Sequence, residues 1–254
     1  MTSLPVAWSL TQRSLVRLTR IPSVILPSVA MPIFFVIAFS GAFSALTRVP
    51  GFGTDEIASW MMPFALLQGA AFAGVGTSFA TGMDLENGFF DRLLLAPSPR
   101  RALLFGSMLA ASIRALIPFC LVVPVGFLAG AEFSDGPVGL LPLLAATEGV
   151  AMWSVLWGLG IFYRFRSLRA ASLTQVGIFV TSFLSVGQVP LTIMTGWLHD
   201  VARVNPMTQV LDLAREGFVG GLSWGETWPG LVAIVAVTAL LAVFAVRGLD
   251  RTVP

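Results

Sequence analysis

The amino-acid sequence predicts an all-α integral membrane protein with six membrane-spanning helices. Composition is the first reason: 56% of the 254 residues are hydrophobic, 11% are charged, and the mean hydropathy is +0.86. A soluble domain carries roughly a quarter charged residues, so this balance indicates a chain that lies in lipid. The second reason is that apolar runs of about twenty residues, the length that crosses a bilayer, alternate with short polar segments. The third is that arginines gather in alternate polar segments, as in multi-pass proteins.

The predicted elements begin with an amphipathic helix over residues 8–20. Arg13, Arg17 and Arg20 share one face of it, so we expect it to lie in the headgroup layer. A solvated helix is the alternative, but a span follows directly, which favours the interfacial position. The six spans are expected at 24–46, 57–80, 103–129, 138–162, 171–189 and 230–246.

Arginine placement predicts that both termini are cytoplasmic. With that orientation the cytoplasmic segments hold eleven arginines and the external segments hold three. The cytoplasmic ones are Arg13, Arg17, Arg20, Arg92, Arg100, Arg101, Arg164, Arg166, Arg169, Arg247 and Arg251, and the external ones are Arg48, Arg203 and Arg215. The excess of positive charge on one side is the usual pattern of the cytoplasmic face.

A short cytoplasmic helix is expected at 84–96, between the second and third spans. Its apolar residues fall on one face at helical spacing: Leu85, Phe89, Phe90, Leu93 and Leu94. Pro97 and Pro99 then end the helix, because proline lacks an amide hydrogen and clashes with the preceding turn. A membrane protein with such a helix has an apolar surface at its cytoplasmic end that a partner can bind.

The segment 190–229 is expected outside the membrane, as a re-entrant pair of short helices. It is too apolar for a solvated loop and too short for two further spans of about twenty residues each. Re-entrant helices that bury their backbone against protein satisfy both facts. Asn205 is expected to cap the second helix, which Pro206 begins. His199 stands beside Asp200, where a surface hydrogen bond is favoured over metal binding.

Two ionisable residues fall inside predicted spans. Arg114 lies about 20 Å past Arg101, and Glu148 lies about 15 Å past Val138, at 1.5 Å per residue. These depths nearly coincide in a hydrocarbon core of roughly 30 Å, so we expect the two charges to pair. The pair is either a structural link between adjacent antiparallel helices, which we favour, or a polar step in a transport path.

Several classes of protein are excluded by what the sequence lacks. All fifteen basic residues are arginine, and a P-loop ATPase needs a lysine to reach the phosphates. One histidine and one cysteine, Cys120, leave no metal-ligand cluster and no intramolecular disulfide. A net charge of +2 does not indicate nucleic-acid binding. We therefore expect no catalytic residue, metal or cofactor on this chain.

Two stretches resemble the permeases of ABC type-2 exporters, in the branch that contains daunorubicin-resistance and nodulation-factor exporters. The first is ENGFFDRLLLAPSPRRALLFGSMLAASIRALIPF from Glu86, and the second is NPMTQVLDLAREGFVGG from Asn205. The first resembles the family's coupling region, which implies that ATPase coupling involves Glu86, Gly88, Phe89, Phe90, Arg92, Leu93 and Pro97. The second resembles the family's external helix motif, here Asn205, Pro206, Thr208, Asp212 and Arg215.

The resemblance implies a complex in the plasma membrane of a bacterium. Its partners would be a cytoplasmic ABC ATPase in two copies, which binds ATP and magnesium, and a second permease, identical or homologous. An amphipathic drug, lipid or lipid-linked glycan would move outward along the second and fifth spans. Residues there that are candidates for the path are Phe64, Gln68, Phe72, Gln175, Phe179, Phe183 and Gln188. For any single one of these aromatic residues, contact with lipid is an equal alternative.

Two other classes remain as alternatives. A secondary, ion-coupled transporter normally has inverted repeats and several intramembrane ionisable groups, whereas this chain has two such groups and no visible repeat. A membrane scaffold that transports nothing would account for the spans but not for the cytoplasmic helix. Co-purification with an ATPase separates the three hypotheses.

Overall fold

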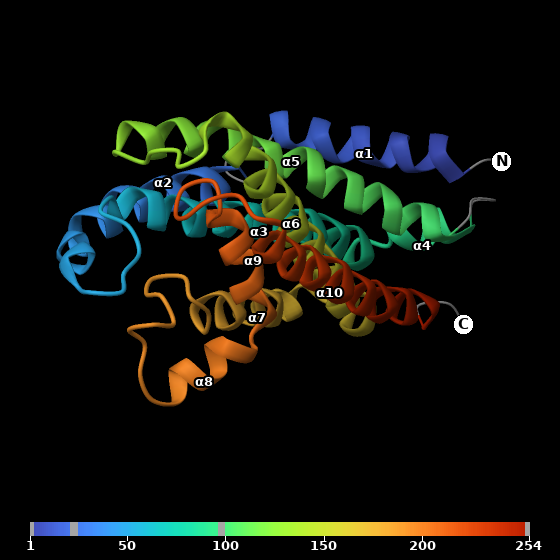
Figure 1. Cartoon of the computed structure of the whole chain (residues 1–254). Coiled ribbons are helices and arrows are strands. Elements are labelled where there is room, and N and C mark those ends of the chain that lie inside the picture. The colour runs from blue at the N-terminus through green and yellow to red at the C-terminus, as the bar shows by residue number, and fades with distance from the viewer. Residues whose placement is uncertain (1–2, 21–24, 96–99, 252–254) are drawn as a thin grey trace.

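The computed structural model describes residues 3–20, 25–95 and 100–251, and these residues form an all-helical bundle (Figure 1). The α-helices are α1 (Ser3–Arg20), α2 (Leu26–Ala42), α3 (Ile57–Glu86), α4 (Phe89–Leu95), α5 (Arg100–Leu128), α6 (Leu140–Phe165), α7 (Ala171–Phe183), α8 (Trp197–Val204), α9 (Pro206–Arg215) and α10 (Trp224–Asp250). The predicted all-α class is confirmed.

Four helices in the described part of the chain are long and apolar enough to cross a membrane: α3, α5, α6 and α10. They fall where the second, third, fourth and sixth spans are predicted. At 1.5 Å per residue, the 17 residues of α2 and the 13 residues of α7 extend only roughly 26 and 20 Å. The helices at the predicted first and fifth spans are therefore shorter than a bilayer core of roughly 30 Å.

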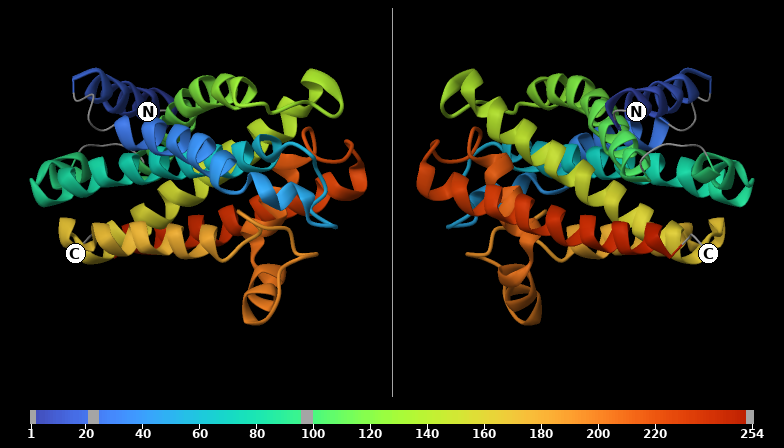
Figure 2. Two further views of the ribbon diagram at one scale, coloured as in Figure 1. Left: turned by 90° about the vertical axis from the view of Figure 1, so that its left-hand side faces the viewer. Right: turned by 90° about the vertical axis from the view of Figure 1, so that its right-hand side faces the viewer.

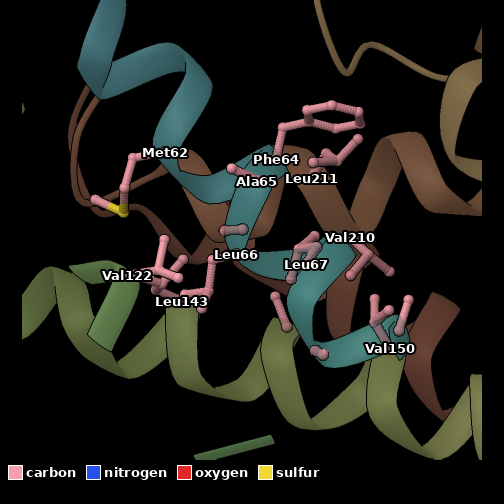
Figure 3. Packing of buried hydrophobic residues seen from close by; sticks show 14 of the residues in the cluster. Met62, Phe64, Ala65, Leu66, Leu67, Val122, Leu143, Val150, Val210 and Leu211 are labelled. Atoms are coloured by element: carbon pink, nitrogen blue, oxygen red, sulfur yellow. The ribbon is translucent and has the colours of Figure 1, made fainter. Parts of the chain in front are cut away.

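The core lies around α3, which is buried along most of its length and packs against α2, α5 and α6. Figure 3 shows Leu66 of α3 beside Val122 and Leu143, and Leu67 beside Val210 of α9. The helices approach closely at Gly74, where an added methyl group would lie 2.6 Å from the carbonyl oxygen of Ala151. Small residues at such crossings allow helices to pack in lipid.

One end of the bundle, here called the α4 end, carries α4, the start of α1 and the end of α10 (Figure 1). At the other end lie the chain after α7 and the short helices α8 and α9. Figure 2 shows α8 standing apart from the long helices, and its Trp197 and Val204 are exposed.

Two short helices within 190–229 are confirmed as α8 and α9. Asn205 caps α9 as predicted, because its Oδ1 accepts a hydrogen bond from the amide of Met207 at 2.9 Å and Pro206 is the first helical residue. The Asn205 Nδ2 also donates to the carbonyls of Thr181 (2.7 Å) and Leu184 (2.8 Å). The cap thus joins α9 to the end of α7.

Several predicted boundaries differ from the observed ones: α1 begins at Ser3 rather than at residue 8, and α7 ends at Phe183 rather than at residue 189. The short helix expected at 84–96 begins only at Phe89, because α3 continues through Glu86 and Gly88 then adopts a left-handed conformation (φ +70°) that breaks the helix. The last helix begins at Trp224 rather than at 230, with Pro229 inside it. A proline near the start of a helix removes few backbone hydrogen bonds, so it does not mark the boundary.

Candidate functional site

The candidate site is the junction at the α4 end, where α1, α3, α4 and α6 meet. Arg13 of α1 donates two hydrogen bonds to Asp84 of α3, from Nη1 to Oδ2 at 2.6 Å and from Nη2 to Oδ1 at 2.8 Å. The same guanidinium lies 4.0 Å above the ring of Phe89, the first residue of α4. The hydrogen bond to Asp84 raises the pKa of Arg13. One arginine therefore holds three helices together through a bidentate ion pair and a cation–π contact.

A second anchor fixes α4 to α6. Phe90 is 3% exposed, and its ring lies 5.5 Å from the ring of Tyr163, the only tyrosine of the chain. Both belong to a buried apolar cluster that also contains Leu85 and Leu249. Outside this cluster, the carboxylate of Asp91 pairs with Arg166, just past the end of α6. A helix of seven residues is marginal by itself, so these contacts position it.

The predicted coupling residues divide between an anchored side and an exposed side of α4. Phe89, Phe90 and Leu93 face the bundle, and Gly88 makes the turn from α3. Glu86 at the end of α3 is exposed, as are Arg92 and Leu95 of α4, the latter to 87%. Pro97 lies outside the described residues. The exposed residues leave α4 with a mixed polar and apolar surface that no other described helix covers.

Sequence reasoning did not predict the ion pairs of Asp84 and Arg166. The signal for Asp84 was present, because it is an acid near the end of a predicted span, and the predicted helix at 8–20 carries three arginines on one face. Arg166 had no comparable signal, since its contact with Asp91 depends on where α6 ends.

We expect the ion pair of Arg13 with Asp84 to hold α1 and α3 together at the α4 end. Arg13→Gln and Asp84→Asn should each destabilise the protein, and the double variant should lose less than the sum. The expected coupling energy is about 1 kcal/mol, because the pair is bidentate but half-exposed. A double-mutant cycle on thermal unfolding measures it. Strictly additive losses would show that the contact contributes nothing.

The aromatic residues proposed to line a path come together where α3 meets α7. The ring of Phe64 lies 5.7 Å from that of Phe183, and the ring of Phe72 lies 5.8 Å from that of Phe179, both edge-on. Phe64 and Gln68 are almost completely buried, and the Gln68 Nε2 has no hydrogen-bond partner within the described part of the chain. Gln175 and Gln188 are half-buried, without a hydrogen bond among the described residues.

The predicted pair of Arg114 and Glu148 is wrong: no ion pair joins these two described residues. Glu148 accepts a hydrogen bond from Ser112, whereas Arg114 lies against Gly76 of α3. Ser112 and Arg114 stand two residues apart on α5, which places them roughly 200° apart around the helix. Counting residues along the helices predicted the depth of the two charges but not their directions. Glu148 contacts one side of α5, and Arg114 points from another side.

Arg215, the last residue of α9, forms a buried clamp at the opposite end of the bundle. It is 3% exposed and donates to three carbonyl oxygens: Trp60 at 3.1 Å, Val186 at 2.7 Å and Gly187 at 2.7 Å. Its guanidinium also lies 3.7 Å from the centre of the Trp60 ring. Burial lowers the pKa of Arg215 to about 9. The clamp ties α9 to the start of α3 and to the irregular chain after α7.

The other residues of the predicted external motif support the same region. The Thr208 hydroxyl donates to the carbonyl of Ala202 at 2.6 Å, across the joint between α8 and α9. Asp212 is exposed and borders a cavity of about 390 Å³ together with Arg215 and Glu226. His199 Nδ1 lies 3.3 Å from the carboxylate of Asp200 on exposed α8.

Comparison with known proteins places these features in a family. The family model described as ABC-2 type transporter matches residues 5–219. These residues include the α4 junction and, at the opposite end of the bundle, both α8 and α9. The "Daunorubicin resistance ABC transporter permease protein DrrB1" of Streptomyces coeruleorubidus is 24% identical over 241 residues, covering 92% of this chain and 81% of that protein.

Two further relatives have similar coverage. The "Probable doxorubicin resistance ABC transporter permease protein DrrC" of Mycobacterium tuberculosis (strain CDC 1551 / Oshkosh) is 25% identical, over 83% of this chain and 76% of its own. The "Putative transport permease ycf38" of Cyanophora paradoxa is 25% identical, over 81% and 71%. Because the family model matches most of the chain, the protein belongs to the ABC-2 type transporter family.

Proposed function

We propose that this chain is the permease subunit of an ATP-driven exporter that moves amphipathic compounds out of a bacterial cell. The observation that carries the proposal is the α4 junction: a seven-residue helix anchored through Arg13, Phe90 and Asp91, with its opposite side exposed. A permease without nucleotide chemistry of its own needs such a rigidly held surface to receive motion from an ATPase.

The α4 end is the cytoplasmic end in this proposal. Arginines dominate the segments there, with Arg92, Arg164, Arg166, Arg247 and Arg251 at or near that end, in keeping with positive charge on the cytoplasmic face. Both termini are then cytoplasmic and α8 and α9 are external. The chain crosses the membrane six times if α2 and the region of α7 each add one crossing to those of the four long helices. In this arrangement α1 lies in the membrane interface, and α8 and α9 form the re-entrant pair.

The partners proposed are an ABC ATPase in two copies, which binds ATP and magnesium, and a second permease, identical or homologous. In this proposal ATP and magnesium bind to the ATPase, and no cofactor is assigned to this chain. Exposed apolar side chains on α2 and α7, such as Phe34, Ile37, Val176 and Val180, provide surface for lipid or for the second permease. The rings of Phe72, Phe179 and Phe183 would border the path between the two.

The proposed cargo is an amphipathic aromatic drug, because two of the relatives carry names of resistance to daunorubicin or doxorubicin. Aromatic side chains suit such a cargo by stacking. A lipid or a lipid-linked glycan is the second candidate, since the α7 face with Val176 and Val180 is open and apolar.

The test is transport by inside-out vesicles that contain this chain and a co-expressed ABC ATPase. We expect daunorubicin uptake that requires ATP and that disappears when the P-loop lysine of the ATPase is replaced. The ATPase should also co-purify with this chain. Uptake driven by an ion gradient without ATP would contradict the proposal in favour of a secondary transporter, and the absence of both uptake and co-purification would favour a scaffold.

A further inference from the structure

Arg114 is a buried cation without a partner among the described residues. It lies near the middle of α5, is 4% exposed, and makes no hydrogen bond, ion pair or ring contact with any described residue. Its guanidinium lies over the backbone of Gly76, where an added methyl group would be 2.7 Å from Nη2. Buried charges in membrane proteins are otherwise paired or line a polar cavity, because an isolated one is costly.

Arg114 opens onto a narrow crevice between α1, α3 and α5, three helices that Figure 1 shows next to one another. Ser14 and Arg17 of α1 line the crevice with it, and Leu18, Phe79 and Met83 form its apolar part. The space is about 60 Å³. A water molecule needs roughly 10–15 Å³, so the crevice has room for a group several times that size. It can accommodate a small oxyanion group but not a whole drug molecule.

The crevice adjoins a cavity of about 580 Å³ that extends toward the α4 end. The two share Ser14, Arg17 and Ala80. Of the described residues that line either space, Asp84 is the one acid. Arg13 already binds both of its carboxylate oxygens. Arg17 is only loosely held, with 3.3 Å from Nη1 to the carbonyl of Ala80 and 3.7 Å to Asp84. Positive charge therefore exceeds negative charge in the combined space.

We propose that Arg17 and Arg114 form a binding site for the phosphate of an anionic phospholipid from the cytoplasmic leaflet. Arginine suits this ligand because its planar fork donates two parallel hydrogen bonds to phosphate oxygens. The apolar side chains at the rim receive the start of the acyl chains, and the larger cavity receives the rest of the headgroup. Basic sites between helices at the cytoplasmic side bind acidic headgroups in this manner.

The site explains the position of α1 independently of what the protein transports. Without an anion, two guanidinium groups line one narrow crevice, and their repulsion opposes the packing of α1 against α5. A bound phosphate neutralises them and joins α1 to α5 and α3. The lipid is thus a structural ligand, and its binding can be measured without ATP or cargo.

The experiment measures the thermal unfolding midpoint of the detergent-purified complex as phosphatidylglycerol or phosphatidylcholine with identical acyl chains is added. We expect phosphatidylglycerol to raise the midpoint of the natural protein by several degrees, with little effect of phosphatidylcholine. Arg114→Gln should weaken the apparent affinity for phosphatidylglycerol at least tenfold. Arg48→Gln, at the opposite end of the bundle, should leave it unchanged. Equal shifts in Arg114→Gln and the natural protein would overturn the proposal.

A second variant keeps the charge and the fold. Gly76→Ala pushes the end of the Arg114 side chain, which is flexible and can swing away, so binding should weaken while the lipid-free midpoint changes little. Gly41→Ala is the matched control, because no atom lies within 4 Å of the added methyl group there. Unchanged phosphatidylglycerol affinity in Gly76→Ala would contradict the site. The same thermal unfolding experiment is repeated with inorganic phosphate in place of the lipid. If phosphate alone reproduces the full shift of the midpoint, the assignment to a lipid is overturned.

Discussion

Phe90→Ala is expected to abolish ATP-driven export while the protein still inserts into the membrane. Phe90 is buried against Tyr163 and is the main apolar anchor of α4. Removing a buried phenylalanine costs about 3–5 kcal/mol, and a seven-residue helix cannot remain in place without its tertiary contacts. We expect ATP hydrolysis to continue but to lose its stimulation by cargo, and vesicle uptake to fall at least tenfold.

Phe105→Ala is the matched control for this prediction. It removes the same side chain from α5, the next long helix, but at a position that is more than half exposed, so transport should persist. Unfolding midpoints of both variants separate loss of coupling from loss of folding. Normal cargo-stimulated hydrolysis in Phe90→Ala would show that the position of α4 is not needed for coupling.

Arg215→Met is expected to cause a large loss of stability at the end of the bundle opposite α4. Methionine fills a similar volume, so the cavity is small, but the carbonyls of Trp60, Val186 and Gly187 lose their donors. An unsatisfied buried polar group costs about 1–3 kcal/mol, so the free energy of unfolding should fall by roughly 3–5 kcal/mol. Arg215→Lys should recover only part, because one ammonium cannot reach all three carbonyls as the planar fork does.

Yield of folded protein and the thermal unfolding midpoint in detergent measure this effect. Arg203→Met serves as the control, since Arg203 is exposed on the neighbouring helix α8, and it should shift the midpoint little. A midpoint for Arg215→Met within a degree or two of the control would mean that the three hydrogen bonds contribute no net stability.

The all-α membrane class could be predicted because hydrophobicity is a property of a whole helix. Arginine placement is likewise a property of the whole polar segments between the helices. Local rules also sufficed at Asn205 and Pro206, where a polar cap and a proline define the start of α9 within three residues. The boundary of α4 could not be obtained in this way. The acidic residues Asp84 and Glu86 suit a helix start, but the chain simply continues α3 through them until Gly88.

The error at Arg114 has a different origin. Depth along a helix can be counted from the sequence, whereas the direction in which a side chain points depends on how the helix is rotated in the bundle. The rotation of α5 places Ser112 toward Glu148 and Arg114 toward Gly76. The hydrogen bonds of Arg215 could likewise not be predicted from the sequence motif that contains it. Their three acceptors come from two other segments of the chain, at Trp60 and at residues 186–187.

The most direct test of the proposed function is site-specific crosslinking from α4. A photo-reactive benzoylphenylalanine replaces Leu95, which is 87% exposed, and a control position is Trp224, which is 74% exposed at the opposite end of the bundle. In the assembled transporter, position 95 should crosslink to the ATPase subunit and position 224 should not. A complex that hydrolyses ATP in response to cargo but gives no crosslink from position 95, or one from position 224 instead, would contradict the assignment of α4 as the contact with the ATPase.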